Sequence, residues 1–115
     1  MRSLNTARGI AASDKELLLC AKQSVVRQIP RAKVLLYGSV ARGTASQDSD
    51  YDILVITPRK LTTREEDAVF DGLYRISLDR DVLLSAVIFS REEWEMPLVK
   101  ASSFRTNVIK DCLLV

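Results

Sequence analysis

The chain has 115 residues, the size of a single domain, and its 47% of hydrophobic and 28% of charged residues are typical of a globular protein. The net charge of +2 argues neither for nor against nucleic-acid binding, and the lysines and arginines form no cluster that would give a strong nucleic-acid signal. The absence of histidine excludes Ser-His and Cys-His catalysis as well as histidine zinc sites.

The first predicted helix follows a loose arm, residues 1–12, in a chain that reads as one domain over 1–115. Ser13 and Glu16 have the spacing of a capping box, with Ser13 as the N-cap. Pro30 ends the helix, because proline cannot continue it. The apolar residues at helical spacing between these limits are Leu18, Ala21, Val25 and Ile29.

Two strands with a short helix between them are predicted next. Lys33–Tyr37 is a β-rich run, and a short helix with Ser39 as its N-cap is expected over residues 39–43. Residues 44–49 are polar and predict a loop. The second strand, Asp52–Thr57, is apolar on both faces beyond its first residue.

A second helix and a third strand follow. Thr62 or Thr63 caps the helix, whose apolar stripe includes Val69, Leu73 and Ile76. The third strand, Asp81–Phe89, is also apolar on both faces, which favours a central position in the sheet.

The last part of the chain is predicted to be helical up to a short apolar tail. The segment Ser90–Glu93 is a capping-box pattern that opens a helix around Trp94, and Pro97 interrupts this helix. A final helix is expected over residues 101–109. The tail Leu113–Val115 is expected to be an exposed edge strand that could pair with another chain, which makes a homo-oligomer one expectation.

In chain order these elements predict an α/β (α+β) fold, a single small domain with a mixed sheet of three to four strands packed by helices. No apolar stretch approaches the length of a membrane span, and the N-terminal residues lack the apolar core of a signal peptide. The two cysteines have no metal-ligand spacing and are typical of free thiols in a reducing compartment. We therefore expect a cytoplasmic protein.

Two carboxylates one residue apart stand at the start of the second strand. Alternation along a strand turns Asp50 and Asp52 to one face and Tyr51 to the other. The two charges repel each other unless a cation compensates them, and hard oxygen ligands suit Mg²⁺ or Mn²⁺. The alternative is that both aspartates simply end a polar loop.

The turn after the first strand suits an anionic ligand. Gly38 lets a phosphate approach the backbone closely, and Ser39 offers a hydroxyl and an N–H at the start of a helix. Arg42 has the geometry to bind phosphate, or else forms a surface salt bridge. An ordinary strand-to-helix turn is the alternative for the glycine and serine. Together with the carboxylate pair, the turn indicates a site for a nucleoside triphosphate with Mg²⁺.

These residues form the pattern G-S-x10-D-x-D, from Gly38 to Asp52. The pattern resembles that of the minimal nucleotidyltransferase (MNT) group in the DNA polymerase beta-like nucleotidyltransferase superfamily. Further positions that fit the group are Ala41, Arg42, Gly43, Ser49, Ile53, Leu54 and Val55. The resemblance implies that Gly38 and Ser39 contact nucleotide phosphates and that Asp50 and Asp52 hold Mg²⁺. The implied reaction transfers a nucleoside monophosphate from a nucleoside triphosphate to an acceptor, with release of pyrophosphate.

The sequence departs from this pattern at the third strand, where active members of the group usually carry a third carboxylate. The middle of that strand, Leu83 to Ser85, has none. Asp81, at the start of the predicted strand, is the one candidate for a third catalytic carboxylate, and a solvated turn aspartate is its alternative role. The departure leaves open a catalytically degenerate domain that works as a binding module for a protein partner.

The resemblance also bears on partners. Small stand-alone members resemble antitoxins that pair with a helical HEPN-type toxin, which some of them modify by adding AMP. ATP is therefore the expected nucleotide and a HEPN-like protein the expected partner. An aminoglycoside-modifying enzyme of the same superfamily is a further alternative, although such enzymes generally need more chain to form the antibiotic pocket.

Overall fold

The computed structural model describes residues 1–45 and 50–115. The predicted loop over 44–49 therefore lies mostly outside the described residues, as does Ser49 of the motif. The elements, in chain order, are the 3-10 helix η1 Leu4–Thr6, α1 Ala12–Gln28, β1 Lys33–Tyr37, α2 Gly38–Arg42, β2 Tyr51–Thr57, α3 Thr63–Arg80, β3 Leu84–Ser90, α4 Arg91–Trp94, α5 Pro97–Lys100, α6 Ser103–Asp111 and β4 Leu113–Leu114.

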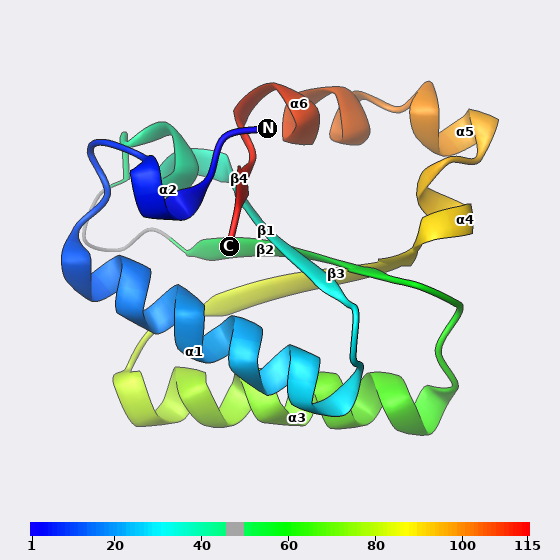
Figure 1. The fold of residues 1–115 in the computed structure, drawn as a ribbon, viewed down its shortest axis with the longest axis horizontal. Helices are drawn as coiled ribbons and strands as arrows, with labels where there is room; N and C mark the ends of the chain where they lie inside the picture. Colours follow the sequence, from blue (N-terminus) through cyan, green and yellow to red (C-terminus); the bar gives the residue numbers. More distant parts are fainter. Residues whose placement is uncertain (46–49) are drawn as a thin grey trace.

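The four strands form one mixed sheet in the order β3-β2-β1-β4 (Figure 1). β1 runs antiparallel to β2 and β4, whereas β2 and β3 are parallel and are connected through α3. The predicted fold class is confirmed. The central position predicted for β3 is wrong, because this strand lies at an edge. β3 is apolar on both faces because helices cover both faces of the sheet. This pattern does not indicate whether a strand has a neighbouring strand on one side or on both.

Helices cover the sheet on both sides (Figure 1). α1 and α3 lie side by side on one face and bury the larger core, which includes Leu18, Val25, Ile53 and Val69. α4 and α6 cover the other face around Leu54 and Trp94. Within the described ranges, no helix combines the length and the apolar character needed to cross a membrane.

The N-terminal arm packs against the domain and is not loose. Leu4 is 1% exposed, and the Leu114 N–H donates to the Arg2 carbonyl at 2.9 Å. On its other side β4 pairs with β1, and Leu113 is fully buried. The prediction of an exposed tail is therefore wrong: the tail forms an edge strand, but it pairs within its own chain and the arm lies along its outer side.

Helix starts were predicted with mixed success. Thr62, one of the two predicted N-caps, caps α3, and the structure adds a capping box with Glu65 that was not predicted. Ser90 and Glu93 form the predicted capping box of α4. Ser13 is not the N-cap of α1, because the Lys15 N–H already bonds to the Ala11 carbonyl and the helix begins at Ala12. Helix α6 begins two residues later than predicted, with Ser102 as its N-cap.

Candidate functional site

The two halves of the sequence motif meet where β1 ends beside the start of β2. Tyr37, the last residue of β1, is paired in register with Asp52 of β2, so Gly38 lies next to the Asp52 side chain. Gly38 has φ +79°, which disfavours any residue with a Cβ. A Cβ at this position would overlap Asp52 Oδ2 and lie 3.2 Å from Asp52 Cγ. Glycine is thus needed both for the backbone turn and to make room for the carboxylate.

Ser39 occupies a different place from the one predicted. Helix α2 begins at Gly38 with Tyr37 as its N-cap residue, so Ser39 lies inside the first turn rather than at the cap. The positive φ of Gly38 explains the shift, because it lets the chain enter the helix directly from the strand. The Ser39 carbonyl accepts a hydrogen bond from the Thr44 N–H at 3.0 Å, which closes the short helix.

The predicted alternation is present at Tyr51 and Asp52, whereas Asp50 precedes the strand. Asp52 shares its face of the sheet with Leu54 and Ile56, which pack towards α4 and α6. Tyr51 faces the opposite side, where its hydroxyl donates to Asp14 Oδ1 of α1 at 2.6 Å. The aromatic residue between the two aspartates therefore anchors the start of β2 to a helix on the far face.

The charges around Asp52 influence one another. Burial raises the pKa of the Asp52 carboxyl, the Asp50 charge raises it further, and the Arg42 guanidinium lowers it. Arg42 also pairs with Asp111 of α6, with 3.4 Å between Nη1 and Oδ2. Of the two roles weighed for Arg42, the structure shows the surface salt bridge, and the guanidinium also lies close enough to act on Asp52. Its binding of phosphate stays a prediction. Asp111 is 69 residues further along the chain, and nothing in the sequence indicated it.

Asp81 is not part of the third strand. It is the C-cap of α3 with φ 52°, a left-handed conformation typical of a helix end, and β3 begins only at Leu84. Its solvent-exposed side chain lines a groove beside α3 rather than the face that carries Asp52. Within the described residues, no cluster of three acidic, histidine or cysteine side chains could hold a metal ion. The structure therefore does not bring Asp81 to the aspartate pair.

Ser85 occupies the position where a third carboxylate was sought. In the parallel pairing of β2 with β3 it stands directly opposite Asp52, and its side chain is exposed. Alternation places it on the same face as Val87 and Phe89, which is also the Asp52 face. The sequence predicted that a third carboxylate, if present, would lie within Leu83–Ser85. The register of β2 with β3 identifies Ser85 as the residue next to Asp52, and it has a hydroxyl in place of a carboxylate.

A cluster of aromatic side chains packs next to the candidate site. Tyr37 and Phe104 meet edge to face with 5.6 Å between ring centroids, and Phe104 also packs against Phe89 and Trp94. Burial, and then the Asp52 charge, raise the pKa of the Tyr37 phenol. Trp94 is 8% exposed, so it belongs to the core and is not a platform for a base.

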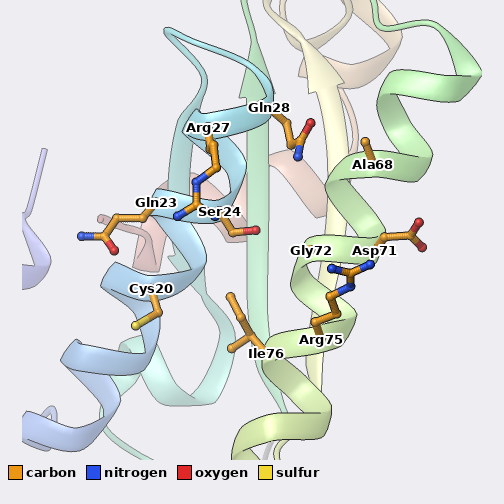
Figure 2. Close-up of a pocket in the computed structure, with 10 residues that line it drawn as sticks. All are labelled: Cys20, Gln23, Ser24, Arg27, Gln28, Ala68, Asp71, Gly72, Arg75 and Ile76. Atoms are coloured by element: carbon orange, nitrogen blue, oxygen red, sulfur yellow. The ribbon is translucent and has the colours of Figure 1, made fainter.

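A groove of about 520 Å³ lies between α1 and α3 and is separate from this site (Figure 2). Arg27 of α1 and Arg75 of α3 line it, and both helices approach closely where the Ser24 hydroxyl packs over Gly72. These helices cover the sheet face opposite to that of Asp52. The groove contains none of the predicted site residues.

The donors present fit a divalent cation. Mg²⁺ and Mn²⁺ prefer oxygen ligands and commonly bind one or two carboxylates, with substrate phosphates completing the shell. Asp50 and Asp52 supply two such carboxylates. Burial first, and then the Asp50 charge, raise the pKa of Asp52, and a bound cation would offset both effects. These two residues could therefore hold the ion.

Comparison with known proteins agrees with this geometry. A family model described as "Nucleotidyltransferase domain" matches residues 19–110. The chain belongs to this family. The match covers the glycine–serine turn, both aspartates and Ser85, and it confirms the nucleotidyltransferase family expected from the G-S-x10-D-x-D pattern.

Two relatives of this nucleotidyltransferase domain are informative. A protein of Methanocaldococcus jannaschii named "Putative protein adenylyltransferase" is 34% identical over 59 residues, which is 51% of this chain and 60% of the relative. The match thus spans less than two thirds of that relative's length. A solved structure titled "Crystal structure of the toxin-antitoxin with AMP-PNP" has a TM-score of 0.51 at 17% identity and covers 82% of this chain and 68% of that one. It shows the same fold.

Proposed function

We propose that this nucleotidyltransferase domain binds a nucleoside triphosphate, ATP in the first instance, with Mg²⁺ or Mn²⁺ between the Gly38 turn and Asp50–Asp52. It transfers the nucleoside monophosphate to an acceptor and releases pyrophosphate. The observation that carries the proposal is the packing of the Asp52 carboxylate over Gly38. It joins the turn suited to phosphate with the residues suited to a cation in one place.

Each residue of the site then has a distinct role. Asp50 and Asp52 hold the ion, which when bound neutralises the negative charge that builds up on the phosphates. The bare α-carbon of Gly38 lets a phosphate approach the backbone, and Ser39 contributes polar contacts beside it. Arg42, 48% exposed at its side chain and bonded only loosely to Asp111, is free to turn towards a phosphate.

The acceptor that we propose is a protein. The relative from M. jannaschii is named as a protein adenylyltransferase, and the structure with the same fold is that of a toxin–antitoxin complex bound to AMP-PNP. Both support a protein partner, and a helical HEPN-type toxin is the specific partner that we propose. Because the reaction consumes nucleoside triphosphate, we place the protein in the cytoplasm.

A second candidate function is a catalytically degenerate binding module. The specific observation in its favour is Ser85, which stands opposite Asp52 where a third carboxylate would be expected. Two carboxylates hold catalytic ions less rigidly than three, and loose positioning lowers the rate of transfer. Such a domain would bind nucleotide and its partner without modifying it.

Radiolabelled transfer separates the two functions. The protein is incubated with ATP labelled at the α-phosphate, Mg²⁺ and a candidate HEPN-type acceptor, and label on the acceptor is followed by gel electrophoresis. Transfer that is lost in Asp52→Asn supports the enzyme. Metal-dependent ATP binding by calorimetry without transfer supports the binding module. Absence of both, in folded protein, contradicts the proposed function altogether.

A further inference from the structure

The two edges of the sheet differ in how they are protected. At one edge, the N-terminal arm lies along β4, and the Arg2 carbonyl of the arm accepts a hydrogen bond from the Leu114 N–H of β4. At the other, β3 has β2 on one side and no neighbour on the other among the described residues (Figure 1). Its sequence, LSAVIFS, contains no charge and no proline, which are the usual features that keep an edge strand from pairing. Among the described residues, the β3 edge is therefore open and unprotected.

The free backbone groups of this edge lie in its middle. The Leu83 carbonyl accepts from the Tyr51 N–H and so faces β2, and alternation then turns the N–H and C=O groups of Ala86 and Ile88 outwards. The two ends of the edge have partners of their own. The Leu84 N–H donates to Ser77 Oγ at 3.3 Å, and the Ser90 N–H donates to Glu93 Oε1 at 3.0 Å.

Exposed apolar side chains border the same edge. Phe70, Tyr74 and Leu78 recur every four residues along α3 and form one stripe, with exposures of 39%, 62% and 64%. Leu83, just before β3, is 58% exposed. These four residues, which we call the edge patch, line a groove of about 560 Å³ beside β3. Helix α3 thus has two apolar stripes: one is buried against the sheet, and the other is exposed beside the free edge of β3.

We propose that a second copy of this chain covers the edge patch, with the two β3 strands paired antiparallel about a two-fold axis at Val87. This register pairs Ala86 of each copy with Ile88 of the other, so the outward groups of both residues are bonded. The two sheets become one continuous eight-stranded sheet. The α3 helices come to lie side by side and antiparallel, and their exposed stripes meet.

Charge complementarity favours this occupant. Asp50, Asp52 and Asp81 all lie near the β3 end that begins the strand, whereas Arg91 follows its other end directly. Arg91 is the first residue of α4, beyond the end of β3, and the acidic Glu92 and Glu93 follow it. Antiparallel pairing about Val87 brings Arg91 of the second copy towards the acidic end of the first, and the two-fold axis repeats the contact.

The edge patch supplies about half of the surface that a dimer needs. The exposed parts of its four side chains amount to roughly 400 Å² per copy. A stable interface takes about 800 Å² from each partner, and the other half has to come from the strand edge and the side chains that flank it.

Sedimentation analysis of the whole chain measures the oligomeric state. We expect a dimer, and we expect Tyr74→Glu combined with Leu78→Lys to raise the dimer dissociation constant at least tenfold, roughly what loss of an interface hot spot causes. Both side chains are mostly exposed, so circular dichroism should show an intact fold. Leu98→Glu, which changes an 86% exposed leucine on α5, is the matched control and should leave the dimer unchanged.

Cross-linking tests the register. In a Cys20→Ser background, Val87→Cys should form an intermolecular disulfide on mild oxidation, because the two α-carbons of a non-hydrogen-bonded pair lie about 4.5 Å apart. Ser85→Cys should not, since its two copies would be about 13 Å apart along the strands. The proposal is overturned if the wild type sediments as a monomer at concentrations well above micromolar. It is also overturned if the wild type is a monomer and its β3 edge binds a different protein. A dimer that survives the edge-patch variant, or that fails to cross-link at position 87, overturns it too.

Discussion

The carboxylate of Asp52 lies over the α-carbon of Gly38 so closely that a Cβ on residue 38 would overlap it. The contact explains why the two parts of the motif, which are separated by ten residues, belong together. The glycine forms the turn, and its missing side chain gives the carboxylate its place. Any residue larger than glycine must either displace Asp52 or distort the turn.

Substitution of Gly38 tests this relationship. Gly38→Ala should reduce metal-dependent ATP affinity at least about tenfold, because the new Cβ pushes Asp52 away from its position. Positive φ adds strain of roughly 1–2 kcal/mol for a non-glycine residue. Gly9→Ala is the matched control, since Gly9 has φ +80° but nothing within 4 Å of its Cβ position. Calorimetry should find ATP binding reduced in the first variant only. Equal binding in both would make Gly38 a residue of the turn alone.

Asp52→Asn should separate ligand binding from folding. The substitution removes a charge that burial and Asp50 disfavour, so the melting temperature of the metal-free protein should stay the same or rise slightly. Metal-dependent ATP binding should be lost, because the amide is a poor ligand for Mg²⁺ beside a single remaining carboxylate. Asp81→Asn, at the end of α3, should change neither property. Unaltered ATP·Mg²⁺ affinity in Asp52→Asn would remove the metal site from the proposal.

Local signals in the sequence predicted much of this fold. The bounds of β1, the capping box of α4 and one of the two N-caps proposed for α3 all follow from short-range chemistry. The capping box of Ser90 and Glu93, for instance, is a contact between residues three apart, so the sequence contains all of it. The same holds for the alternation that turns Tyr51 and Asp52 to opposite faces.

Relations between distant segments were not predictable in this way. The order of strands puts β3 at an edge, although its apolar pattern favoured the centre, because the pattern records only that helices cover both faces. Asp81 was placed on a strand, but the left-handed cap of α3 ends the helix there first. Asp111 reaches Arg42 only through the packing of α6 near α2. The strand order and the Arg42–Asp111 pair depend on tertiary contacts, whereas the helix end at Asp81 is a local feature that was not predicted.

The capping box of α3 should make stability sensitive to acid. Bonds from Arg59 and from the Thr62 N–H hold the pKa of Glu65 at about 2, below its ordinary value of 4.5. Above pH 4.5 the carboxylate is ionised in folded and unfolded chains, and its stabilisation is complete. Between pH 4.5 and about 2 the unfolded chain takes up the proton first, so this stabilisation is lost as the pH falls.

Melting curves of Glu65→Gln measure that loss. The variant should melt at a lower temperature than the wild type at pH 6, and the difference should shrink towards pH 2. Glu66→Gln removes the same charge from the same helical turn without touching the capping box, and it should follow the wild-type profile. A constant difference across the pH range would assign the effect to packing of the glutamate and not to its ionisation.

The effect of Ser85 on the proposed transfer can be tested directly. Because Ser85 stands opposite Asp52 and on the same face, Ser85→Asp would place a third carboxylate beside the pair. If the wild type transfers nucleotide slowly for lack of this ligand, the variant should raise the transfer rate by an order of magnitude or more, about the gain expected when catalytic ions are held rigidly. Labelled transfer at saturating ATP measures the change.

Ser85→Asn is the control, because it has the size of aspartate without the charge. It should not raise the rate, and since Ser85 is exposed, neither variant should unfold the domain. If Ser85→Asp instead binds Mg²⁺ more tightly without any gain in transfer, the domain lacks more than one ligand, and the binding module becomes the better account. If wild type already transfers rapidly and Ser85→Asp slows it, the serine hydroxyl is itself suited to the reaction, and two carboxylates are enough for this chain.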